Sequence, residues 1–168
     1  MTAGTPQGAS SSGPNAPEPL IEQTIEVAAP VTKVWGLVSD LPRLSQWSPQ
    51  VVRTVPLGRG AIGQGTRLVN LNRKGLLVWP SQSKVVRFEP EREIAFRVFE
   101  NHAVWSFTLE ATDTGTRIVQ RRELPEGLTA LSARFTDLLL GGQAGFTADL
   151  REGMRLTLER IKAEAERG

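Results

Sequence analysis

Apolar residues recur along the C-terminal stretch from about Leu128 to Ala165 at spacings of three, four and seven, which is the periodicity of one helix face. These positions are Leu128, Leu131, Phe135, Leu138, Leu139, Phe146, Leu150, Met154, Leu158 and Ile161. The opposite face is mostly charged, so we expect it to be solvated. Pro125 and Glu126 fit a first helical turn, because proline loses no hydrogen bond there and an acid suits the positive helix end. The pattern predicts one long amphipathic helix that needs a large apolar surface to lie on.

Upstream of that stretch, apolar and polar residues alternate between Leu20 and Val27, which predicts a half-buried strand. Pro30 then opens a short helix, because proline is favoured at the first helical position. Asp40 is a good cap residue, and the segment that follows it, Leu41 to Gln46, predicts a second short helix.

Between Val51 and Glu123 the pattern predicts six more strands joined by tight turns. Their expected ranges are 51–56, 65–73, 77–88, 93–99, 103–111 and 116–123. Asp113-Thr114-Gly115 is the clearest hairpin signal in the chain. The element order predicts an α+β fold, in which a curved seven-stranded antiparallel sheet wraps around the long C-terminal helix and two short helices follow the first strand. Such an arrangement leaves a space between the sheet and the helix.

The composition of the 168-residue chain excludes several kinds of functional site. It has no cysteine, which excludes disulfides, thiolate zinc sites and cysteine nucleophiles. His102 is the only histidine, so a histidine-based metal site would need carboxylates for nearly every other ligand, and we expect no metal and no cofactor. The net charge of +2 is small, and basic residues are interspersed with acidic ones, which argues against a nucleic-acid partner.

The length of the chain suits one domain with a sizeable core. Residues 1–18 are mainly Gly, Ser, Thr, Ala and Pro, so we expect a disordered tail before a domain of residues 19–168. No apolar run reaches the length of a membrane span, and the N-terminus lacks the basic-then-apolar order of a signal peptide. We therefore expect a cytoplasmic protein without membrane insertion.

Two glycine-rich segments allow competing interpretations. The segment from Gly58 to Gly63 matches G-x-G-x-x-G, but a dinucleotide site requires a helix to follow it. The residues that follow predict a strand, which favours a hairpin loop at the rim of the sheet. Gly141, Gly142 and Gly145 interrupt the predicted long helix, where each costs ~1 kcal/mol relative to alanine. They indicate a kink or a close helix–sheet contact, or else room for a ligand beneath the helix.

The inward face of the predicted sheet mixes large apolar side chains with polar ones. The apolar ones are Trp79, Phe96, Trp105 and Phe107, and the polar ones are Asn70, Asn72, Ser81, Ser83, Gln120 and Arg122. A plain core would avoid the polar set, because an unpaired buried polar group costs ~1–3 kcal/mol. The mixture favours a pocket for a mostly apolar ligand, the alternative being that the polar residues lie at strand ends and contact water.

Several ordered segments carry a family resemblance. The first of them are Ile25-Glu26-Val27-Ala28-Ala29-Pro30, Val34-Trp35, Val38-Ser39-Asp40-Leu41-Pro42 and Trp47-Ser48-Pro49. The ordered set covers nearly all of residues 20–165 and resembles the START-like, or SRPBCC, superfamily, above all its actinobacterial single-domain members related to polyketide cyclase/dehydrases. The resemblance implies a helix-grip fold with a deep cavity between sheet and C-terminal helix. It also implies the binding of a lipid, polyketide or other hydrophobic small molecule, but it does not imply a reaction.

We expect the cavity to bind a hydrophobic small molecule without catalysing a reaction. The expected ligand-binding residues are Trp47, Asn70, Trp79, Ser81, Phe96, Val98, Trp105, Gln120, Arg122, Phe135, Leu139, Gly142 and Phe146. The polar members of this set would fix the polar end of the ligand, and the ligand would enter near Trp47, the hairpin tips and the glycines at 141–145.

Two alternatives stay open. A polyketide cyclase or dehydratase would use the same cavity, with Arg122, Gln120 and His102 as candidate catalytic residues. A chaperone-associated module would use its surface and bind no small ligand. The protein is expected to be a monomer or a homodimer in each case.

Overall fold

The computed structural model describes residues 17–127 and 129–168. The elements in this part of the chain are β1 (Leu20–Val27), α1 (Val31–Val38), the short 3-10 helix η1 (Leu41–Arg43), α2 (Leu44–Trp47), β2 (Val51–Leu57), β3 (Arg67–Lys74), β4 (Leu77–Glu89), β5 (Glu93–Val98), β6 (Val104–Thr112), β7 (Gly115–Glu123), α3 (Ala130–Leu139) and α4 (Gly142–Ala165). The expected tail of residues 1–18 falls mainly outside the described residues, and so does Leu128.

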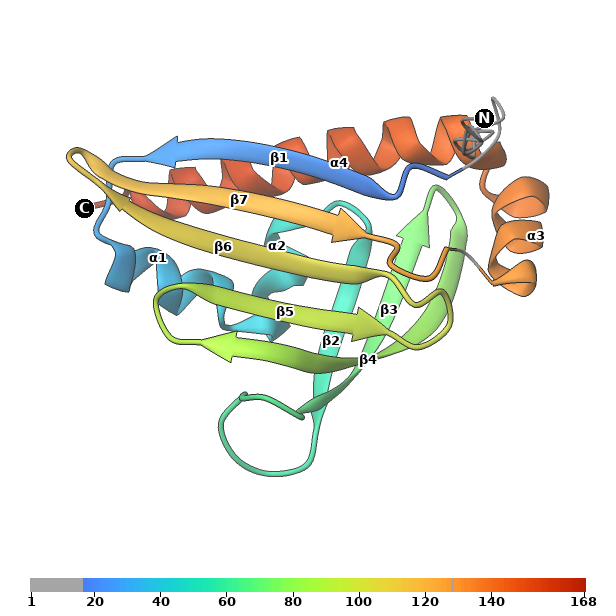
Figure 1. Ribbon diagram of the computed structural model, residues 1–168, viewed down its shortest axis with the longest axis horizontal. Coiled ribbons are helices and arrows are strands. Elements are labelled where there is room, and N and C mark those ends of the chain that lie inside the picture. The colour runs from blue at the N-terminus through green and yellow to red at the C-terminus, as the bar shows by residue number, and fades with distance from the viewer. Residues whose placement is uncertain (1–16, 128) are drawn as a thin grey trace, which may run out of the picture.

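The seven strands form one antiparallel sheet in the order β1-β7-β6-β5-β4-β3-β2. Strands β2 to β6 each pair with the next strand in sequence, and β1 pairs with β7 over its full length. Figure 1 shows the sheet curving away from β1, with α4 running along β1. The predicted helix-grip class, an α+β fold with a long C-terminal helix, is confirmed.

The hydrophobic core fills only one end of the space between sheet and helices. There α1 and α2 contact α4. The buried cluster at this end includes Val34, Leu41, Trp47, Phe107, Leu158 and Ile161. A second, smaller cluster of Ile21, Leu150 and Met154 lies further toward the N-terminal half of α4. The space next to this smaller cluster is therefore not filled by α1 and α2.

The prediction of a single C-terminal helix was wrong. Helix α3 ends at Leu139, and α4 starts at Gly142. Between them Gly141 has φ 83° and Gly142 has φ 84°, a left-handed backbone that favours glycine and ends a right-handed helix. The consecutive glycines therefore break the helix completely instead of kinking it, and α3 is free to take its own direction at the end of the sheet, as Figure 1 shows.

The start of the first C-terminal helix differs from the prediction, whereas the segment predicted to begin at Leu41 does begin there. Helix α3 begins at Ala130 because Thr129 caps it, its hydroxyl oxygen accepting a hydrogen bond from the Ser132 backbone N–H at 3.2 Å. Pro125 and Glu126 lie instead in a turn after β7. Asp40 stands at the cap position of η1, but its side chain makes no capping hydrogen bond.

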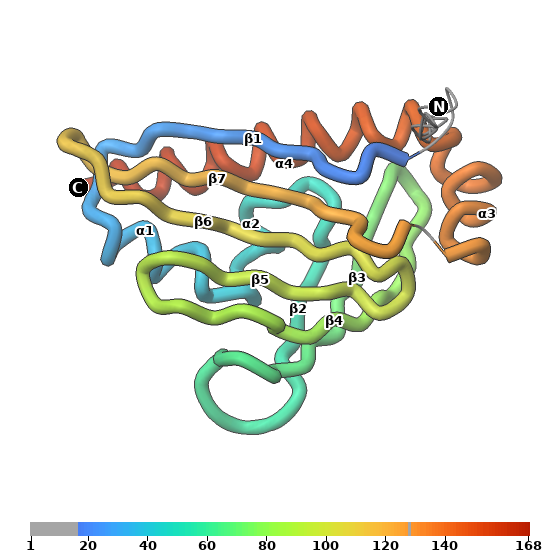
Figure 2. Tube along the Cα trace, in the orientation of Figure 1, coloured from blue at the N-terminus to red at the C-terminus, as the bar shows by residue number. Residues whose placement is uncertain are grey.

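The G-x-G-x-x-G segment, Gly58–Gly63, lies in the loop between β2 and β3, which Figure 2 shows standing away from the rest of the chain. The element that follows is strand β3, so in the described chain no helix N-terminus is presented to a phosphate there. The segment is a hairpin loop, as the sequence favoured.

Candidate functional site

A cavity of about 480 Å³ lies between the sheet and the helices α3 and α4. Strands β3 to β7 supply its walls, and both helices contribute lining residues. Its large apolar lining residues include Trp79, Phe96, Trp105, Phe107, Phe135 and Phe146. The cavity exists because the main core cluster fills only the other end of the same space.

Helix α3 is held over the cavity by an aromatic contact and a lysine. The rings of Trp79 on β4 and Phe135 on α3 meet edge to face, with centroids 5.7 Å apart. Lys74, at the end of β3, donates a hydrogen bond to the Leu140 carbonyl at the α3–α4 junction and lies 2.7 Å from an Asp149 carboxylate oxygen on α4. The β3–β4 hairpin and the helix junction are thus tied together beside the cavity.

Ten of the thirteen residues predicted to bind ligand line this cavity. They are Asn70, Trp79, Ser81, Phe96, Val98, Trp105, Gln120, Arg122, Phe135 and Phe146. They come from five strands and two helices. The strand residues meet because inward-facing positions alternate along each strand and the sheet curves around one space. Their role in binding stays a prediction, but the structure brings them together.

The other three predicted residues do not line the cavity. Trp47 is buried in the main core, with the Arg43 guanidinium 5.1 Å from its ring centre. Leu139 is 57% exposed at the end of α3. Gly142 is the first residue of α4, directly after the break between the two helices.

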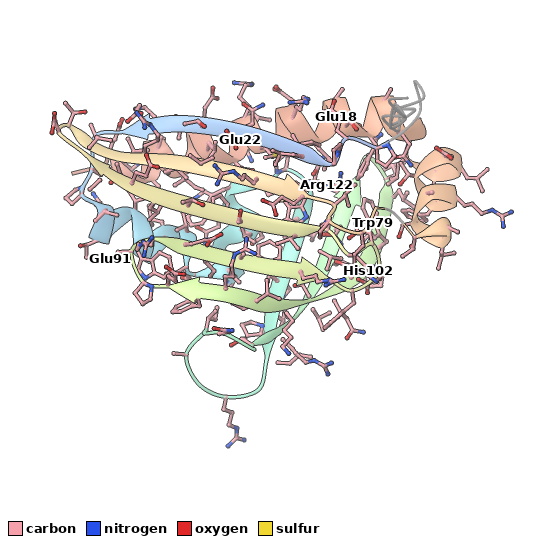
Figure 3. The ribbon with its side chains drawn as sticks, in the orientation of Figure 1. Glu18, Glu22, Trp79, Glu91, His102 and Arg122 are labelled. Carbon is pink, nitrogen blue, oxygen red and sulfur yellow. The ribbon has the colours of Figure 1, made fainter. Side chains whose placement is uncertain are left out.

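His102, a candidate catalytic residue, also lies outside the cavity lining. It sits in the turn between β5 and β6 with φ 60°, and its Nδ1 is 3.1 Å from a Glu126 carboxylate oxygen. Figure 3 labels it near the turn between β5 and β6, apart from Arg122 on β7. The His102 imidazole is therefore not positioned to contact a molecule in the cavity.

Most polar groups on β3 and β4 satisfy one another. The Thr54 hydroxyl donates to Asn70 Oδ1 at 3.0 Å, and Asn70 Nδ2 donates to Ser83 Oγ at 3.1 Å. Asn72 Nδ2 donates to Ser81 Oγ at 2.9 Å. Each of these polar residues thus has at least one hydrogen-bond partner within the sheet, which accounts for the polar groups on this part of the inner face.

The polar groups on β7 are different. Gln120 and Arg122 point to the same face, two residues apart, and are 6% and 3% exposed. The Gln120 Oε1 atom has no hydrogen-bond partner among the described residues. Burial lowers the pKa of Arg122 to about 10, with no neighbouring acid contributing, and the group therefore stays charged at neutral pH. Figure 3 shows Arg122 on β7 at the end of the molecule where Trp79 also lies.

Sequence reasoning included Phe135 of α3 but missed Lys74 and the other lining residues that come from α3 and its C-terminal end. Ser132, Thr136 and Leu140 line the cavity, but only the helix break brings α3 over it. Lys74 contacts a carbonyl 66 positions further along the chain, and no local pattern marks such a partner.

Neither a metal site nor a membrane-spanning helix is found within residues 17–127 and 129–168. No three His, Asp or Glu side chains gather there as metal ligands would. None of the helices in this range combines the length and apolarity needed to cross a membrane.

A family model described as "Polyketide cyclase / dehydrase and lipid transport" matches residues 19–166. A comparison with curated proteins finds no match. Among solved structures, the di-domain ARO/CYC StfQ from the steffimycin biosynthetic pathway superposes with a TM-score of 0.69 at 16% identity, over 88% of this chain and 50% of StfQ. This chain therefore spans half the length of StfQ.

Two single-domain structures are similar over nearly their whole length. The Polyketide_cyc-like protein Cgl2372 from Corynebacterium glutamicum gives a TM-score of 0.60 at 24% identity, over 92% of this chain and 94% of that protein. The Zhui aromatase/cyclase from Streptomyces sp. R1128 gives 0.62 at 20% identity, over 88% and 93%. At these identities the similarity establishes the common fold.

Proposed function

Because this chain belongs to the polyketide cyclase / dehydrase and lipid transport family, we propose that its cavity binds a hydrophobic small molecule of the polyketide or lipid class. The observation that carries the proposal is the cavity itself, about 480 Å³ in volume and walled by aromatic side chains from three strands and two helices. Pockets that hold small molecules span ~300–1,000 Å³ and are mostly apolar, with a few polar groups.

The driving force for binding is the removal of apolar ligand surface from water, worth ~25 cal/mol per Å². Trp79, Trp105 and Phe135 offer large, rigid faces for this contact. The paired groups on β3 and β4 add no unsatisfied hydrogen bonds, so an apolar part of the ligand can lie against them without leaving a new buried polar group unpaired.

The proposed entry lies between α3 and the β3–β4 hairpin. Leu76 at the hairpin tip and Leu131 on α3 are strongly exposed apolar residues on either side of it. Trp47, which the sequence placed at the entrance, is buried in the core and takes no part.

A second candidate function is catalysis in the same cavity, as a polyketide cyclase or dehydratase. The observation in its favour is Arg122, a buried cation that would stabilise an enolate oxygen. Against it, His102 lies outside the cavity, so the chain offers no histidine and, having no tyrosine, no phenol as an acid or base there. Binding without reaction is therefore our first proposal. The chaperone-associated function and the cytoplasmic location stay predictions.

The proposal is tested by filling the cavity and titrating N-phenyl-1-naphthylamine, a neutral apolar dye that fluoresces in apolar surroundings. Ser81→Phe places a large ring inside the cavity, while Gln82→Phe places the same ring on the outer, exposed face of the same strand. We expect the wild-type protein and Gln82→Phe to bind the dye, and Ser81→Phe to bind it at least ~10-fold more weakly. Equal binding by both variants would place the dye elsewhere and refute the proposal.

A further inference from the structure

Arg122 is a buried cation for which the described residues supply no counter-ion. Its side chain is 3% exposed and lines the cavity. Among residues 17–127 and 129–168, no hydrogen bond or ion pair involves its guanidinium, and burial is the only cause of its lowered pKa. The cation is therefore held in an apolar cavity with nothing from the described chain to balance it.

The neighbouring basic residues show that carboxylates are plentiful elsewhere. Arg121, adjacent on β7 but on the outer face, lies 2.7 Å from a Glu22 carboxylate oxygen. Lys74, at the cavity edge, is paired with Asp149. Glu100, the one carboxylate in the lining, accepts the Gln82 backbone N–H through both oxygens. Arg73 also lines the cavity, but its side chain is exposed to solvent; among the charged lining residues of the described chain, Arg122 is the one that is both buried and unpaired.

A second unsatisfied group lies beside it. Gln120 is two residues earlier on the same face of β7, about 7 Å away along the strand. Its Oε1 atom is buried and lacks a donor within the described part of the chain. Two adjacent buried groups, a cation and a hydrogen-bond acceptor, are thus left without partners in the described chain, whereas the other buried polar residues of the cavity lining each have a hydrogen-bond partner.

We propose, building on the proposed binding function, that the ligand is an apolar molecule with an anionic oxygen group, which the Arg122 guanidinium binds inside the cavity. The planar guanidinium presents parallel N–H donors that match two oxygens of such a group. A hydroxyl or enol next to the anion donates to Gln120 Oε1. The apolar remainder lies toward Trp79, Trp105 and Phe135.

The test uses two dyes that share one aromatic skeleton. 8-Anilinonaphthalene-1-sulfonate carries an anionic oxygen group, and N-phenyl-1-naphthylamine lacks it. We expect wild-type protein to bind the sulfonate roughly 10- to 100-fold more tightly than the neutral dye, the range for hydrogen bonds to a charged group. Arg122→Met should abolish this preference while retaining the neutral dye, and Arg122→Lys should retain most of it.

Arg121→Met is the matched control, because it removes the same charge from the outer face of the same strand; it should leave the preference unchanged. Circular dichroism checks each fold, and Arg122→Gln replaces the methionine variant if that one does not fold. Equal affinity of wild-type protein for the two dyes, or a preference that survives in the neutral Arg122 variant, overturns the anion assignment alone. Failure of the wild-type protein to bind the neutral dye refutes the binding function itself.

Discussion

Replacing Arg122 with methionine should make the empty protein more stable. Burial lowers the pKa of this guanidinium from its ordinary value to about 10, a shift of more than two pKa units. One pKa unit corresponds to about 1.36 kcal/mol, so keeping the charge in the folded state costs about 3 kcal/mol. Methionine is unbranched and apolar, and it fills much of the same space without a charge.

The sign of the effect follows from the two protonation states. The folded-state pKa is depressed, so at pH 7 Arg122 is charged in both the folded and the unfolded chain, and the cost is fully present. It is relieved only as the pH rises above about 10, where the folded state begins to lose the proton. At pH 7 we expect Arg122→Met to raise the free energy of unfolding by about 1–3 kcal/mol, and Tm by about 2–10 °C for a chain of this size.

Calorimetry on protein freed of bound ligand measures this change. Arg121→Met is the control: its ion pair with Glu22 lies on the surface, where such pairs contribute ~0–1 kcal/mol, so its Tm should stay constant or fall slightly. A lower Tm for Arg122→Met would mean that Arg122 stabilises the empty fold, and the argument from an unpaired cation would be refuted.

Three further changes probe the hairpin, the lysine tie and the histidine. Gly115→Ala should lower Tm by several degrees, because φ at this position is +150° and an added Cβ would collide with the backbone at and after the end of β1. Gly63→Ala is the control, because an added Cβ there meets open space, and its Tm should change little. Equal Tm values for the two variants would contradict this reasoning. Lys74→Met removes the ion pair with Asp149, which is expected to contribute ~1 kcal/mol. Association of the neutral dye, measured by stopped-flow mixing, should therefore become about fivefold faster. An unchanged association rate would exclude an entry beside α3. His102→Asn keeps a residue that tolerates the left-handed backbone at this position, and it should leave the dye affinity within about twofold of the wild-type value. A larger loss of affinity would indicate that His102 takes part in binding.

The strands could be predicted closely from the sequence because their signal is local. The alternation from Leu20 to Val27 gives the observed bounds of β1, and the prediction for residues 77–88 misses β4 by one residue. The same alternation assigns each side chain to a face, which is why Asn70 and Arg122, on strands far apart in sequence, were correctly placed on one wall.

What the sequence could not give depends on backbone conformation and distant partners. In the sequence, Gly141 and Gly142 are compatible with either a kinked helix or a broken one. Their left-handed φ values in the structure show that the helix is broken. The polar set on the inner face looks uniform in sequence. The structure divides it into groups paired across β3 and β4 and an unpaired group on β7, because pairing depends on the register between strands.

The four tryptophans allow the most direct test of the central claim, that a hydrophobic molecule binds in this cavity. Trp79 and Trp105 line it, whereas Trp35 and Trp47 pack in the main core. In an NMR titration with N-phenyl-1-naphthylamine, with the indole N–H signals assigned by Trp→Phe variants, we expect saturable shifts of the Trp79 and Trp105 signals and little change in the other two. Shifts of equal size in all four signals, or no saturable shift of Trp79 and Trp105, would contradict the account.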